Sequence, residues 1–193
     1  MRQANIICKR GKYIIDFPCP TFKNYLVGRF DHDGDGEISL EEARRIEYID
    51  LWHCMKKSDG LDDMPLGFPI KMELLAGIEY FENLRGLCCN GCGIKGPLNL
   101  INNKRLTSIC CGDNRITELI LGEQPKLTCL DCGNNRIKEL DISRIPSLAI
   151  LHCPGNLLRT LDLSRNPKLE ELDCSNNRIK SPGATYCHKI VFH

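Results

Sequence analysis

Twelve residues near the start of the chain carry oxygen ligands at the spacing that a hard metal ion requires. Residues 31–42 read DHDGDGEISLEE. A calcium loop takes side-chain oxygens at its first, third and fifth positions, a backbone carbonyl at the seventh, a water-linked group at the ninth and a bidentate Glu at the twelfth. We therefore predict a Ca²⁺ site made by Asp31, Asp33, Asp35, Glu37, Ser39 and Glu42.

The alternative is an acidic surface turn, which accounts neither for Gly36 at the sharp bend nor for the apolar Ile38. Helical patterns before and after the loop complete an EF-hand arrangement. Such loops usually act in pairs, and we find no second one in the sequence. This favours a constitutive structural ion over a sensor that opens a groove, although both remain hypotheses. We expect the apolar helix faces of this unit to cover the open end of the rest of the chain.

Thiols are the second group of residues with chemical potential. The chain has 13 Cys, and two C-x-x-C pairs, Cys89 with Cys92 and Cys129 with Cys132, could indicate zinc or redox chemistry. An odd count cannot pair fully. The states of Cys8, Cys19, Cys54 and Cys187, as disulfides or free thiols, stay open.

A repeat of 22 and then 21 residues decides where most of these thiols lie. The repeats begin at leucines, and a Cys column and a mostly Asn column follow at fixed offsets, as in the leucine-rich repeat pattern. The leucines are Leu84, Leu106, Leu127, Leu148 and Leu169. The cysteines are Cys89, Cys111, Cys132, Cys153 and Cys174, and the asparagines are Asn114, Asn135, Asn156 and Asn177.

One repeat alone buries too little apolar surface to offset its backbone entropy, so the repeats must stack. We predict an α/β solenoid rich in β, right-handed and of about five to six turns, with a small helical EF-hand cap at its N-terminus. The column cysteines are buried, the column asparagines bind backbone groups at each bend, and alternating apolar residues indicate a second strand on the far wall of every turn.

The predicted strands leave certain side chains on the outer, concave face, where solenoids bind ligands. Cys132 is buried while Cys129 points outward, so this pair cannot share a metal, and Cys89 and Cys92 both point inward. The candidate binding residues are Cys88, Cys110, Cys129, Asp131, Ile150, His152, Glu171 and Asp173.

Two catalytic interpretations of this face compete with simple binding. Cys88, Cys110 and Cys129 could form a redox or metal cluster, but three partly exposed thiols explain them as well. His152 lies between Asp131 and Asp173, yet it has no paired nucleophile, so we interpret it as part of a surface cluster. We expect no enzymatic activity.

The repeats divide the chain into four parts. Residues 1–50 form the cap, with one short strand at residues 13–15; residues 51–83 form an irregular insertion and a degenerate first repeat. Residues 84–181 form the repeats, and residues 182–193 form a C-terminal cap or tail.

The segments FDHDGDGEISLEEA, GIEYFENLRGLCCN, LTCLDCGNNRIKELDISRIPSL and LEELDCSNNRIKS resemble the internalin-like bacterial leucine-rich-repeat proteins of the cysteine-ladder type with an EF-hand-like cap. The resemblance implies a recognition surface, no catalysis and a secreted or surface-attached protein. The chain departs from the family in having Cys92 in place of the first column Asn, an insertion at residues 52–73 and no export signal.

Composition narrows the remaining function classes. The chain of 193 residues is 42% hydrophobic and 26% charged, with a net charge of +1. The charge gives no support to nucleic-acid binding, and no apolar run is long enough for a transmembrane segment. We expect a monomer that binds a protein or glycan, located in the secreted or surface compartment, with the cytoplasm as the alternative.

Overall fold

The computed structural model describes residues 3–51, 72, 74–180 and 189–191, the last three in their backbone only. Most of the insertion predicted at residues 52–73 and most of the C-terminal tail lie outside these residues, as do Cys54 and Cys187. Within the described part, no helix has the length and apolar character needed to cross a membrane.

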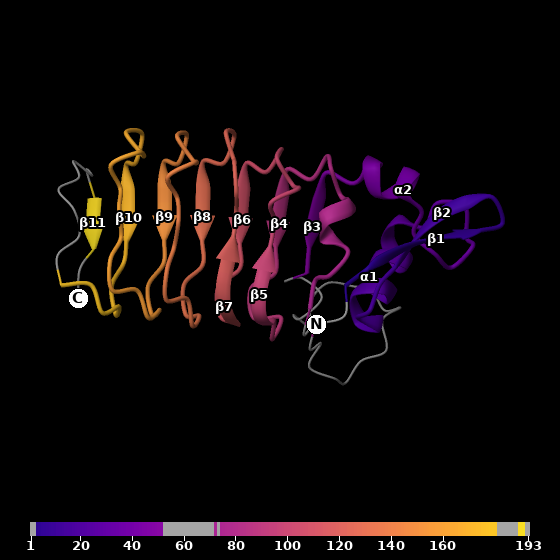
Figure 1. Cartoon of the computed structure of the whole chain (residues 1–193), viewed down its shortest axis with the longest axis horizontal. Helices are drawn as coiled ribbons and strands as arrows, with labels where there is room; N and C mark the ends of the chain where they lie inside the picture. Colours follow the sequence, from indigo (N-terminus) through magenta and orange to yellow (C-terminus); the bar gives the residue numbers. More distant parts are fainter. Residues whose placement is uncertain (1–2, 52–71, 73, 181–188, 192–193) are drawn as a thin grey trace, which may run out of the picture.

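A seven-stranded parallel sheet forms one wall of the molecule and confirms the predicted solenoid (Figure 1). Its spatial order is β11-β10-β9-β8-β6-β4-β3, so the chain advances by one strand per turn. The strands are β3 (Tyr48–Asp50), β4 (Gly86–Cys88), β6 (Ser108–Cys110), β8 (Cys129–Asp131), β9 (Ile150–His152), β10 (Glu171–Asp173) and β11 (Lys189–Val191). The repeat strands β4 to β10 enclose about four complete turns, fewer than the five to six expected.

Each strand of this sheet is three residues long, and β6, β8, β9 and β10 each bury only the middle residue. Leu130 is fully buried in β8, whereas Cys129 and Asp131 on either side of it are half-buried. A column Cys follows each strand from β4 to β10 and is also buried, with Cys132 at 0% exposure. The core is therefore a stack of leucines, isoleucines and thiols, as the repeat predicts.

The column asparagines close each bend as expected. Asn135 is 7% exposed, and its Nδ2 donates to the carbonyls of Cys111, Cys132 and Gly133 at 3.0–3.1 Å. Its Oδ1 accepts from the backbone N–H of Ile116 at 2.9 Å. Asn114, Asn156 and Asn177 repeat this pattern. The residue directly before each of these four asparagines has a positive φ, a backbone conformation that Gly and Asn tolerate best.

A second amide column lies on the opposite bend, where the sequence analysis did not place one. Asn103 donates from Nδ2 to the carbonyls of Ile78 and Phe81 at 2.8 and 3.0 Å, and the chain buries it completely. Three turns further along, Asn166 donates in the same way to the carbonyls of Ile142 and Ile145. Gln124, one turn along, donates to the Leu100 carbonyl of the preceding turn and to the Leu121 carbonyl of its own turn. These amides join successive turns from inside the core.

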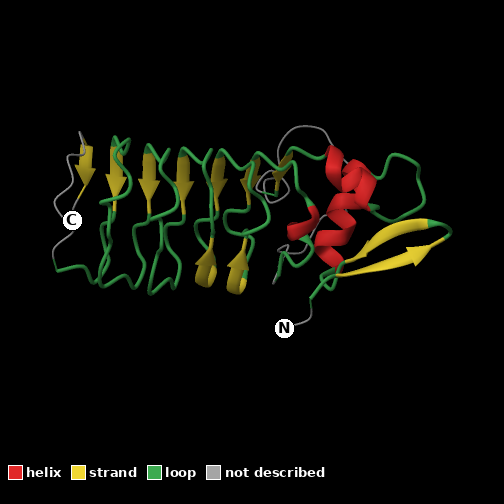
Figure 2. Ribbon diagram, turned by 45° about the horizontal axis from the view of Figure 1, so that its top comes forward, coloured by secondary structure: helices red, strands yellow, loops and turns green. Residues whose placement is uncertain are grey.

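The far wall is extended only in part, so the prediction of a strand in every turn was wrong. β5 (Lys95–Asn99) and β7 (Arg115–Ile120) pair in parallel, but the next two turns have no strand there (Figure 2). Leu140 and Ile142 are still buried. Their alternation reflects packing against neighbouring turns, which does not require a ladder of backbone hydrogen bonds.

The N-terminal cap combines a hairpin with two helices, whereas the sequence predicted a helical cap with one short strand at residues 13–15. β1 (Asn5–Lys9) and β2 (Lys12–Asp16) are antiparallel, and α1 (Pro20–Phe30) and α2 (Leu40–Arg45) flank the acidic loop. The backbone N–H of Ile15 donates to the carbonyl of Ile38 at 2.9 Å. The hairpin therefore contacts the end of the acidic loop through its second strand.

Three phenylalanine rings join the cap to the solenoid. Phe22 of α1 lies 5.5 Å from Phe17 and 6.4 Å from Phe81, measured between ring centroids. Phe81 follows the short helix η2 (Ile78–Tyr80) and is fully buried. The cap therefore covers the open N-terminal end of the repeat core, as expected.

Candidate functional site

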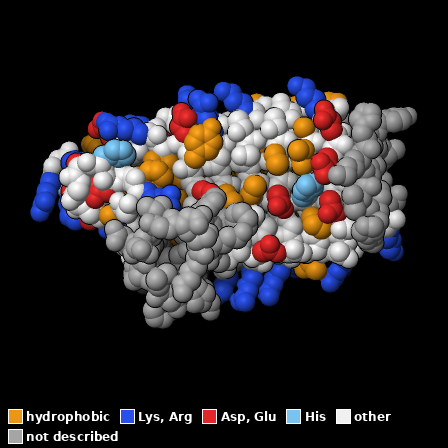
Figure 3. Space-filling model, turned by 180° about the vertical axis from the view of Figure 1, so that it is seen from behind, with side chains coloured by type: hydrophobic (Ala, Val, Ile, Leu, Met, Phe, Trp, Pro, Cys, Tyr) orange, Lys and Arg blue, Asp and Glu red, His pale blue; other side chains and the backbone are white. Residues whose placement is uncertain are grey.

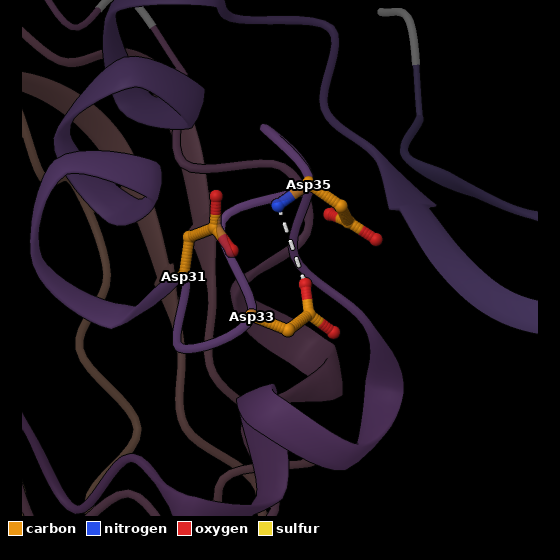
Figure 4. A group of neighbouring side chains, drawn as sticks. All are labelled: Asp31, Asp33 and Asp35. Carbon is orange, nitrogen blue, oxygen red and sulfur yellow. Dashed lines mark hydrogen bonds between the residues drawn. The ribbon is translucent and has the colours of Figure 1, made fainter.

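The acidic loop gathers three of its predicted ligands (Figure 4). One side-chain oxygen each from Asp31, Asp33 and Asp35 lie within 4.8 Å of one another. Both oxygens of Asp31 accept backbone N–H groups, from Gly34 and Gly36, at 2.8 Å. The backbone N–H of Asp35 donates to Asp33 Oδ1 at 3.3 Å. The loop backbone thus orients the carboxylates toward a common point.

Lysines neutralise this loop in the structure. The Lys12 ammonium contacts Asp33 and lies 2.8 Å from Asp35 Oδ2. These hydrogen bonds raise the pKa of Lys12, and the Lys12 ammonium lowers the pKa of Asp35. Glu37 binds Lys23 and Lys9 through its carboxylate at 2.5 and 2.7 Å, and both ammonium groups lower its pKa. The carboxylates of the acidic loop therefore already attract positively charged groups, namely these lysine ammonium groups.

Glu42 and Ser39 are committed to the start of α2. The Ser39 hydroxyl accepts from the Glu42 backbone N–H, and Glu42 Oε2 accepts from the Ser39 backbone N–H at 2.9 Å, which together form a capping box. The Ser39 hydroxyl also donates to Glu42 Oε2. Glu42 Oε1 accepts from the backbone N–H of His32 at 2.9 Å. Glu42 is 5% exposed. Its carboxylate oxygens accept hydrogen bonds from protein groups, so they have partners without a metal ion. The structure thus brings together Asp31, Asp33 and Asp35, while Glu42 binds protein groups.

The residues fit a hard divalent cation through three converging carboxylates, and the Glu37 carbonyl is the fourth oxygen that the loop pattern supplies. Ca²⁺ prefers oxygen ligands of this kind. Binding would require the cation to replace the Lys12 ammonium at Asp33 and Asp35. Completion of the ligand shell by Glu42 would require its carboxylate to exchange hydrogen bonds for metal contacts.

The concave face carries two rows of outward side chains in register. Cys88 pairs with Cys110, and the row continues through Asp131, His152 and Asp173. The other row runs from Gly86 through Ser108, Cys129 and Ile150 to Glu171. All eight candidate residues of this face are half-buried.

His152 does lie between Asp131 and Asp173 along its row, but its hydrogen bond goes elsewhere. Its Nε2 lies 3.2 Å from Oε1 of Glu171, and Glu171 belongs to the other row. The histidine and the acidic side chains therefore form one surface cluster.

Two outward residues of β3 were missed by the sequence analysis. Tyr48 and Asp50 pair in register with Gly86 and Cys88 and extend the two rows by one strand. The sequence does carry the pattern of a repeat strand here, because residues 48–50 place one apolar residue between two positions that point outward in such a strand.

The thiols separate by environment. Cys8 is an exposed thiol, and Cys19 is a buried one. Burial raises the pKa of the column thiols such as Cys111 and Cys132, which makes them poor nucleophiles. On the concave face, the thiol hydrogen bond between Cys88 and Cys110 lowers the pKa of Cys110 and raises that of Cys88. Desolvation raises the pKa of Cys129.

Among the described residues, the one cluster of three or more metal-ligating groups is the aspartate trio of the loop. Within this part of the chain, the outward thiols do not meet the ligand count of a tetrahedral metal site.

Comparison with known proteins places the repeats in a recognised architecture. The family profile for the Leucine Rich Repeat matches residues 168–188. The functional domain of InlJ from Listeria monocytogenes, which includes a cysteine ladder, superposes with a TM-score of 0.67 at 30% identity. The alignment covers 86% of this chain and 33% of that one.

An internalin, InlF, from the same organism superposes with a TM-score of 0.64 at 21% identity, covering 86% of this chain and 45% of its own. This chain thus spans less than half the length of either protein. A search of curated proteins gave no match. These comparisons support the leucine-rich-repeat solenoid.

Proposed function

We propose that the chain is a non-enzymatic leucine-rich-repeat module that binds a protein ligand through its concave face, on a secreted or surface-attached protein. The observation that carries the proposal is the continuous sheet face, on which two rows of outward side chains run in register from β3 to β10. The solenoid likeness to InlJ and InlF supports it. Recognition of a glycan by the same face is the alternative.

Binding to protein and glycan arrays tests this proposal. We expect the wild-type chain to bind defined proteins, and a triple alanine variant at Asp131, His152 and Asp173 to lose at least roughly tenfold in affinity for them. Alanine also removes the oxygens that accept from the Gly133 and Ser175 N–H groups, so the binding comparison is made below the melting temperature of the variant, measured by circular dichroism. Binding to glycans alone would support the alternative, and equal binding by the variant would place the ligand on another surface.

We further propose that Ca²⁺ occupies the loop at residues 31–42 and stabilises the cap, with Asp31, Asp33, Asp35 and the Glu37 carbonyl as its principal ligands. The converging aspartates support this. The ion would supply a fixed positive charge in place of the Lys12 ammonium. Because the cap packs on the first turn through Phe22 and Phe81, its stabilisation extends to the solenoid.

Calcium at one hundred times its dissociation constant is expected to stabilise the chain by about 2.7 kcal/mol. For a chain of this size, that raises the melting temperature by roughly 5–10 °C relative to a sample with chelator. Differential scanning calorimetry with and without Ca²⁺ measures the shift.

Asp33→Asn should abolish the shift, whereas Glu41→Gln should preserve it. The control removes the same charge within the loop, but Glu41 pairs with Arg45 on the outer side of α2 and is not a predicted ligand. The calcium proposal is wrong if chelation leaves the melting temperature unchanged and no Ca²⁺ binds at millimolar concentration. A calcium-dependent increase in the binding of an apolar dye would instead favour the sensor.

A further inference from the structure

An exposed aromatic ring lies at the N-terminal end of the concave face. Tyr48 is 61% exposed although it belongs to the main sheet. A Cβ atom at Gly86 would lie 2.8 Å from Tyr48 Cδ1 and 3.5 Å from Ser108 Oγ. The ring therefore occupies the space that a side chain on β4 would fill, and it lies against the sheet surface. Glycine at residue 86 makes this placement possible.

The cap holds the strand that carries this ring. The Tyr25 hydroxyl of α1 donates to the carbonyl of Asp50 at 3.0 Å and accepts from its N–H at 3.3 Å. The Glu47 carbonyl accepts from the N–H groups of Arg85 and Gly86. Hydrogen bonds thus fix the backbone of both neighbouring segments, at Glu47 and at Asp50. The Tyr48 ring is therefore preorganised for contact with a ligand.

The remainder of the face is acidic. Its outward positions on β3 to β10 include Asp50, Asp131, Glu171 and Asp173 and no Lys or Arg. Figure 3 shows Asp and Glu side chains around a histidine on this side, while Lys and Arg side chains lie along its upper and lower margins. The acidic part of the face comprises Asp131 on β8 and Glu171 and Asp173 on β10. It is described only as far as β10, because the side chains of β11 lie outside the described residues.

The distance between the aromatic and acidic parts defines the size of a matching ligand. Five strand spacings separate β3 from β10, which at about 4.8 Å each give roughly 24 Å. An extended peptide advances about 3.3 Å per residue, so roughly seven residues span the face. Neutral glycans offer no charge to match the carboxylates, and anionic polymers would be repelled by them.

We propose, on the basis of the binding function above, that the ligand of this face is an extended basic segment of a partner protein. One end carries Arg or Lys opposite Asp131, Glu171 and Asp173. The other end places an apolar side chain on the Tyr48 ring. Charge complementarity selects the basic end, and the ring on Gly86 fixes the register.

Selection from a random decapeptide library on the immobilised chain tests this directly. We expect enriched peptides to contain an excess of Arg and Lys separated from an apolar residue by about four to seven positions, which correspond to the distances from β3 to β8 and to β10. Enrichment of peptides without basic excess, lost in the triple alanine variant, would overturn the inference while leaving the protein-binding proposal standing. Failure to enrich any peptide would also overturn the inference, and the array experiment would then judge the binding function separately.

An enriched peptide then serves as the probe in fluorescence polarisation. We expect Asp131→Asn combined with Asp173→Asn, and separately Tyr48→Ser, to weaken its binding roughly tenfold, and binding to weaken with added salt. The Asn side chains keep the oxygen that accepts from Gly133 and Ser175, so the turns stay intact. The control pair Glu118→Gln with Glu139→Gln makes the same charge change at exposed positions outside the main sheet. Equal weakening by the control, or none by either site variant, would overturn the inference.

Discussion

Replacing Asn135 with alanine is expected to lower the free energy of unfolding by about 3–5 kcal/mol. The Asn135 amide donates to three carbonyls and accepts one N–H, all at a buried bend between two turns. Alanine removes the partner of each group, and water has little access because the residue is 7% exposed. Urea denaturation followed by circular dichroism measures the loss.

Two further variants identify the cause. Arg136→Ala changes the exposed neighbour on the same bend and should alter stability by less than about 0.5 kcal/mol. Asn135→Asp keeps an oxygen for the Ile116 N–H but places a carboxylate against three carbonyls. It should destabilise the chain at least as much as alanine. A loss for Asn135→Ala no larger than that of Arg136→Ala would show that the amide column does not hold the turns together.

Such asparagines could be predicted because one residue type recurs at one offset with the same geometric task. The second amide column was not predictable in this way. Its positions hold Asn103, Gln124, Ile145 and Asn166, so the side-chain length changes and an apolar residue interrupts the series. Each amide nevertheless donates to a carbonyl of the preceding turn, because a bend offers carbonyls that either Asn or Gln can reach. When the residues of a column share an amide group but differ in residue type, only the structure reveals the column.

The candidate sites show the same division. The spacing of the aspartates predicted their convergence, since loop geometry is local. The environment of Glu42 was not predictable, because a Ser at the start of a helix with Glu three residues later is also a capping box. Tyr48 was missed because a three-residue strand contains too few positions to determine its register without its neighbour.

The junction between cap and solenoid also depends on long-range contacts, since the hairpin and the three phenylalanine rings come together from separate segments. Phe81→Ala is therefore expected to lower the free energy of unfolding by about 3–5 kcal/mol. The ring is fully buried and lies 6.4 Å from both Phe17 and Phe22. Its loss leaves a cavity where the cap covers the first turn. Urea denaturation measures the change.

Phe81→Leu, which keeps most of the apolar volume, should cost less than alanine, and Tyr13→Ala at a 64% exposed position should cost little. The backbone carbonyl of Phe81 also accepts from Asn103, so the cavity adjoins the second amide column. If the cap and solenoid are one cooperative unit, hydrogen exchange at Ile15 in the hairpin and at Leu130 in β8 should accelerate together in Phe81→Ala. Acceleration at Ile15 alone would show that the cap unfolds separately, and Ca²⁺ bound at its loop would then stabilise the cap without stabilising the concave face.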